Sequence, residues 1–172
     1  MIKQTPWLQR TFKGPADPGL YPDTIERVRG IDVRIVNLIH GVSEETLRLK
    51  PGGKWSIKEQ IGHLWAVDHL HITRLHELKK GVETFTPADM SNQKTDQAKF
   101  NGRPLCDLLN QLAAKRSELM DLLDNVEDEM ITRSAYHERL KSQMSWHDIA
   151  HFAAEHVDHH LAVIRRLVVE NL

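Results

Sequence analysis

The most apolar helical face of this chain lies near its carboxyl end and carries two histidines, His156 and His160. Apolar residues recur around them with the helical period; they are Ile149, Phe152, Ala153, Val163, Ile164 and Leu167. Two imidazoles four residues apart differ by about 40° in direction and about 6 Å in rise, so both can approach one point. Burying both rings in hydrocarbon is unfavourable unless a polar group receives their nitrogens. This face therefore predicts a buried helix that helps to bind a divalent metal ion.

A helical repeat of apolar residues also governs most of the remaining sequence, and strand-like alternation is nowhere sustained. Four helices are expected, over about 22–40, 56–80 and 104–126, and from Ser145 nearly to the carboxyl end. The second and fourth begin with capping-box spacings, which are Ser56 with Glu59 and Ser145 with Asp148. The pattern predicts an all-α protein, a four-helix bundle.

Three segments lack a steady period and are expected to be irregular. Residues 1–21 are rich in proline and glycine, which predicts an arm laid over a helical domain formed by 22–172. Residues 81–103 form an unusually long connection for a helical domain, so they either cross the bundle from end to end or cover a site. Residues 127–144 are expected to form a second irregular connection. The predicted bundle therefore has a long crossover between its second and third helices.

Composition restricts the classes of function. The chain of 172 residues has 23 lysines and arginines against 24 acids, with no long run of one sign. Nucleic acid and anionic membranes therefore gain no electrostatic support as partners, and no segment approaches a membrane span. Cys106 is alone, which excludes an internal disulfide and a cysteine-rich zinc site. These features favour a cytoplasmic protein.

A metal site needs at least a third ligand besides the pair on the last helix. On the second helix, both His63 and His71 point into the apolar arc, whereas His69 and His76 point away from it. His63 lies close to the helix start and His71 is nearer the middle of the arc. Because the relative heights of two helices cannot be read from sequence, periodicity leaves His63 preferred and His71 as its rival.

Two charged residues interrupt apolar stripes elsewhere. Asp32 falls within the stripe of the first helix, and Arg116 falls within that of the third. Buried charges are rare unless paired, so the two residues either pair with each other or serve the site. In the functional interpretation Asp32 accepts the free N–H of a ligand histidine, while Arg116 holds a substrate carboxylate. His147 and His151 share the four-residue spacing but are expected on the solvated side.

Three stretches carry a family resemblance: LKPGGKWSIKEQIGHL, KRSELMDLL and, above all, HFAAEHVDHHLAVI. Over about 22–170 the chain resembles the DinB/YfiT-like superfamily of four-helix-bundle metalloproteins, and its P-G-G-x-W segment is similar to the metal-dependent thiol transferase branch. That branch has tryptophan where this chain has Glu155, which leaves the subgroup open. The resemblance implies His63, His156 and His160 as ligands of zinc or nickel, a long crossover and a homodimer.

Three neutral imidazoles would leave a divalent ion its full charge and an open position, the form that activates a bound nucleophile. The leading expectation is a metal-dependent enzyme, and the resemblance suggests a transferase that uses a low-molecular-weight thiol. A hydrolase that activates water is the nearest variant. The other classes are a non-catalytic metal-binding stress-response module and a structural protein whose histidines bind no metal.

Overall fold

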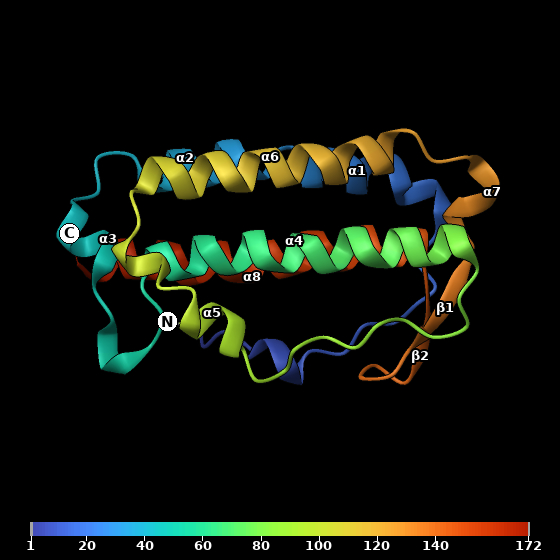
Figure 1. Ribbon diagram of the computed structural model, residues 1–172, viewed down its shortest axis with the longest axis horizontal. Helices are drawn as coiled ribbons and strands as arrows, with labels where there is room; N and C mark the ends of the chain where they lie inside the picture. The colour runs from blue at the N-terminus through green and yellow to red at the C-terminus, as the bar shows by residue number, and fades with distance from the viewer. Residues whose placement is uncertain (1, 172) are drawn as a thin grey trace.

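The protein is a bundle of long helices with a β-hairpin at one end (Figure 1). The structure, a computed structural model, describes residues 2–171. The helices are α1 (Tyr21–Arg29), α2 (Ile31–Ile39), α3 (Glu44–Arg48), α4 (Ile57–Lys80), α5 (Gln93–Gln97), α6 (Leu105–Asp124), α7 (Asp128–Ile131) and α8 (Trp146–Glu170). The strands are β1 (Ser134–His137) and β2 (Ser142–Ser145). The predicted four-helix bundle is confirmed, with α1 and α2 together forming its first member.

The first member of the bundle is interrupted, where the sequence predicted one continuous helix. Gly30 separates α1 from α2 because its ψ of 1° departs from helical geometry. The apolar stripe nevertheless continues across the break, since Val28, Ile31 and Ile35 are all fully buried. Burial of this stripe keeps the two short helices in line.

The second and fourth members begin as the sequence predicts. Ser56 accepts a hydrogen bond from the backbone N–H of Glu59, whose side chain caps the helix start in return. Ser145 and Asp148 form the same reciprocal pair at the start of α8. Gly81 ends α4 in the left-handed conformation at φ 76°, which costs glycine no steric strain. The bounds of α4 and α8, which carry the histidines, are therefore set by local sequence.

The long connection after α4 both crosses the bundle and covers part of it. It runs back along the length of α4, so that α4 and α6 point the same way and pack together (Figure 1). Phe100 of this connection packs directly on Gly62 of α4, so closely that a Cβ added to the glycine would lie 2.3 Å from Cγ of the phenylalanine. Because Phe100 is buried at this point, the crossover is held against α4 beside His63.

The second connection contains regular structure that the sequence analysis did not predict. β1 and β2 pair antiparallel, with Ala135 opposite Met144, and both side chains are buried. Each strand has only four residues, too few for alternation to stand out from an irregular segment. The hairpin leads directly into α8.

The segment before α1 follows the surface of α8. Gln4 donates hydrogen bonds to His159, and Phe12 packs against Phe152 with 4.7 Å between ring centroids. The backbone N–H of Ala16 donates to the Asp148 carboxylate at 2.8 Å. The division of the chain into an arm and a domain stays a prediction.

Candidate metal centre

Three histidines from two helices converge between α4 and α8. One ring nitrogen each of His63, His156 and His160 lies within 4.8 Å of the other two. The Nε2 atoms of His156 and His160 are 3.0 Å apart. All three rings are buried, with at most 8% of their surface exposed. The structure thus brings together the set that the resemblance implies.

Polar neighbours orient two of the rings. Gln60, one turn before His63 on α4, accepts a hydrogen bond through its Oε1 from Nδ1 of His160. Nδ1 of His63 lies 3.0 Å from the hydroxyl of Thr95, which comes from α5 in the crossover. A donor bond at Nδ1 leaves Nε2 with its lone pair, the state in which an imidazole binds a metal.

Burial keeps the cluster neutral. Desolvation lowers the pKa of His63 to about 4 and the pKa values of His156 and His160 well below their ordinary value. The mutual proximity of the rings lowers the pKa of His156 further, because a second imidazolium would be repelled. At neutral pH the three rings are therefore in the form that coordinates metal.

The cluster fits a divalent ion. Nε2 of His160, left bare by the bond to Gln60, lies 3.0 Å from Nε2 of His156, so in the absence of an ion it accepts the His156 proton, whereas a cation between the rings could coordinate both nitrogens. Nδ1 of His156 is buried without a hydrogen-bond partner, so the polar contact recorded for that ring is the one with His160 inside the cluster. Three neutral nitrogen donors suit zinc or nickel better than calcium or magnesium, which prefer oxygen.

A cavity of about 290 Å³ opens onto the cluster. Trp55 lies against His63 with 4.6 Å between ring centroids, and Trp7 lies against His156 at 4.7 Å. Apolar walls continue from them, formed by Leu8, Val67, Leu70, Met90, Phe152 and Val163. The histidines therefore face a recess with aromatic sides, partly covered by the segment before α1.

His71, the rival ligand, lies outside the cluster but lines the same cavity. It is fully buried, and neither ring nitrogen has a hydrogen-bond partner. Its Nδ1 is 3.6 Å from a carboxylate oxygen of Asp68 on the same helix. His71 lies two turns after His63 on α4, and therefore further along the cavity than the two histidines of α8. Sequence periodicity could not show this, because it does not give the position of one helix along another.

Asp32 and Arg116 do not take the places that the sequence analysis gave them. Arg116 pairs with Asp68 at 2.9 Å inside the bundle and does not line the histidine cavity. Asp32 makes no hydrogen bond to a cluster histidine among residues 2–171, and its buried Oδ1 has no partner. Burial raises the pKa of Asp32, although Arg116 partly offsets this. The sequence showed two interrupted stripes but not the acid on α4 that pairs with the arginine.

Two other histidines also differ from expectation. His147 was expected in solvent but is buried, with its Nε2 3.0 Å from the Thr24 hydroxyl. His137, which the sequence left without a role, is buried and lines the histidine cavity from the hairpin. Because it lies in a segment without a period, no sequence signal pointed to this position.

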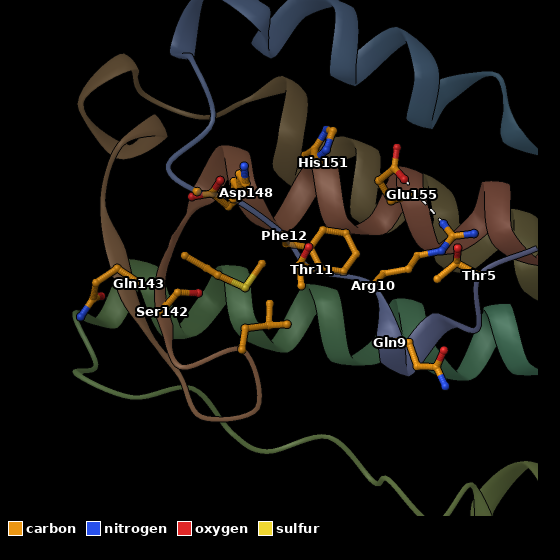
Figure 2. A pocket seen from close by; sticks show the side chains of 14 residues that line it. Thr5, Gln9, Arg10, Thr11, Phe12, Ser142, Gln143, Asp148, His151 and Glu155 are labelled. Carbon is orange, nitrogen blue, oxygen red and sulfur yellow. Dashed lines mark ion pairs between the residues drawn. The ribbon is translucent and has the colours of Figure 1, made fainter.

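A second cavity of about 610 Å³ lies on the other side of the segment before α1, between that segment, the hairpin and α8. Figure 2 shows its polar lining, including the ion pair of Arg10 with Glu155. Its acids already have partners, since Asp148 caps α8 and Glu155 also pairs with Arg27. Buried side-chain nitrogens without a hydrogen-bond partner, which could bind a ligand, lie instead in the smaller, histidine-lined cavity, on His71, Arg74 and His156.

Comparison with known proteins agrees with this geometry. Residues 32–164 match the DinB superfamily, a span that includes all three histidines of the cluster. The chain belongs to the DinB superfamily. Among solved structures, it is similar to YfiT from Bacillus subtilis, with a TM-score of 0.81 and 16% identity over 93% of each chain. That protein is described as a probable metal-dependent hydrolase with an unusual four-helix bundle topology.

Two further findings complete the comparison. No curated protein matches the sequence of this DinB superfamily member. Within residues 2–171, every helix is too short or too polar to cross a membrane.

Proposed function

We propose that this protein is a metal-dependent enzyme in which His63, His156 and His160 bind one divalent ion, with zinc or nickel the best candidates. The observation that carries the proposal is the convergence of three buried, neutral imidazoles from two helices on one point beside a cavity. A structural ion needs no recess beside it, whereas a reacting ion needs a position that substrate can reach.

The chemistry proposed is activation of a small nucleophile. A divalent ion in this site would lower the pKa of a bound thiol or water and so supply a nucleophile at neutral pH. The protein's own part is to hold the rings: Gln60 fixes His160, Thr95 contacts His63, and Trp55 and Trp7 pack against His63 and His156. Glu155 pairs with Arg27, away from the cluster, and supplies no obvious general base.

A low-molecular-weight thiol is the preferred nucleophile. Apolar and aromatic walls suit a soft, weakly hydrated sulfur better than they suit water, and the P-G-G-x-W segment resembles the thiol transferase branch. The second candidate is a hydrolase, which the description of YfiT favours. Both candidates use the same three histidines and differ in which molecule is activated.

The test compares both reactions in one preparation. Zinc- or nickel-loaded protein is offered a panel of thiols with an electrophilic acceptor, and separately a panel of esters and amides without thiol. We expect metal-dependent loss of thiol that His156→Ala abolishes and that His76→Ala, a change on the exposed side of α4, leaves intact. Hydrolysis without thiol would assign the second candidate. Metal binding with neither reaction would overturn the enzymatic proposal.

A further inference from the structure

The histidine cavity extends well beyond the cluster, along one face of α4. The residues of α4 that line it recur at helical spacing; they are His63, Val67, Leu70, His71 and Arg74. From His63 to Arg74 the helix rises by about 16 Å. On α8, which runs the opposite way in Figure 1, the lining passes from His160 and His156 to Phe152. The cavity thus has a histidine end and a second end around Arg74 and Phe152.

Arg74 is a buried cation without an acid. Its side chain is only 2% exposed, and its Nε has no hydrogen-bond partner. One terminal nitrogen reaches the carbonyl oxygen of Thr86 at 3.4 Å, and the guanidinium lies 5.7 Å from the ring centroid of Phe85. It makes no ion pair within residues 2–171. Burying an unpaired charge is costly, so a fold that retains one has a use for it.

Arg139 and His137 adjoin the same end from the hairpin. Arg139 lies 5.7 Å from the ring centroid of Phe152 and, like Arg74, has no ion-pair partner among the described residues. Nδ1 of His137 accepts a hydrogen bond from the backbone N–H of Leu140 at 3.3 Å, so the neutral ring carries its proton on Nε2. All three side chains line the cavity and offer donors.

Burial and neighbouring charges shift the pKa values of these side chains. Burial lowers the pKa of Arg74 to about 10, with Glu77 opposing the shift and Arg139 adding to it. Burial and both arginines lower the pKa of His137 to about 4. Within the described part of the chain, the nearby acids make no ion pair with the two arginines: Glu77, whose charge stabilises the Arg74 cation, accepts hydrogen bonds from Thr86, and Asp89 is an exposed residue of the cavity lining. Both guanidinium groups are therefore free of direct ion pairs and can bind an anion at the far end of the cavity.

We propose that Arg74 and Arg139, with His137, bind the anionic group of a small substrate, a carboxylate or a phosphate. This inference rests on the proposed function, because it assigns the reactive part of that substrate to the histidine end. Phe152, which Arg139 covers, precedes His156 by one helical turn, and Arg74 follows His63 by three turns, so the anion and the reacting atom are separated by roughly 6–16 Å. The substrate class is a small molecule with an oxyanion at that distance from its reacting group.

Anion binding is measured on the whole chain stripped of metal, so that the histidine cluster cannot itself hold the probe. Inorganic phosphate, acetate and succinate are titrated by calorimetry against wild type, Arg74→Gln and Arg139→Gln. Arg165→Gln is the matched control, because it removes the same charge from the exposed side of α8. We expect saturable binding of phosphate or a carboxylate, weakened about tenfold to a hundredfold by either cavity variant and unchanged by the control.

The outcomes separate this inference from the proposed function. Tighter binding of phosphate would assign a phosphoryl group to the substrate, and tighter binding of succinate or acetate would assign a carboxylate. Absence of saturable binding, or equal affinity in all four proteins, overturns the anion site even if the histidines bind metal. Because Arg139 is only half-buried in the hairpin turn, its variant tests the proposal even if Arg74→Gln fails to fold.

Discussion

Replacing Gly62 by alanine should destabilise the protein, although alanine is the better helix former. The new Cβ would lie 2.3, 2.4 and 2.6 Å from three ring carbons of Phe100, whereas carbon atoms in contact prefer about 3.5–4.0 Å. The ring must therefore move by more than about 1 Å. It is only 1% exposed, so it can move only if the crossover moves with it.

The expected magnitude follows from two opposed effects. Overpacking a buried contact costs about 1–3 kcal/mol, and the severity of this overlap argues for the upper end. Alanine in place of an interior helical glycine returns about 1 kcal/mol. The net loss of about 2 kcal/mol corresponds to a fall in Tm of about 4–8 °C for a chain of this size.

Thermal and urea unfolding of wild type and four variants measure the effect. Gly102→Ala is the control, since no atom lies within 4 Å of the point that its new Cβ would occupy, and it should be nearly neutral. Adding Gly62→Ala to Phe100→Ala should cost little, because the obstructing ring is gone. A Gly62→Ala protein as stable as wild type would show that the crossover does not pack on α4 in this way.

Three further predictions concern the interior. Gln60→Ala should weaken zinc affinity by about tenfold to a hundredfold by freeing the His160 ring, and an unchanged Kd in a competition titration would contradict this. Arg116→Met should cost about 3–5 kcal/mol by leaving Asp68 buried and unpaired, whereas adding Asp68→Leu should restore much of it; urea unfolding in which the double variant is the less stable protein would refute the pairing. Metal-free protein should lose stability as pH falls from about 6.5 to about 4. The pKa of His63 is lowered to about 4 by burial, so the unfolded chain takes up protons in this window that the folded chain does not. A stability that stays flat across this range in urea titrations would contradict buried neutral rings.

Local sequence patterns were sufficient to predict the two helices, α4 and α8, that carry the histidine cluster. The capping boxes at Ser56 and Ser145 set the starts of α4 and α8, and the apolar stripe of α8 placed His156 and His160 on its buried face. These features are local, so they can be read from neighbouring residues. The choice of His63 over His71 depends on how far one helix is shifted along another, which is a tertiary property. Only the family resemblance supplied it.

The remaining differences arise from contacts between distant segments. Asp68 forms an ion pair with Arg116 from another helix, and the cations around Arg74 come together only because the hairpin folds back against α4 and α8. The four-residue strands of that hairpin are too short for alternation to reveal them. Sequence patterns identify which side chains are buried more readily than they identify the partners of those side chains.

Titration of metal-free protein with cobalt, followed by its visible absorption, tests the three-histidine site most directly. We expect one ion bound per chain, with the intense visible bands of a low-coordinate site, and stoichiometric displacement by zinc. His63→Ala, His156→Ala and His160→Ala should each lose the spectrum, while His76→Ala, exposed on α4, should retain it. A spectrum that survives all three cluster substitutions, or wild-type protein that binds no ion, would contradict the account.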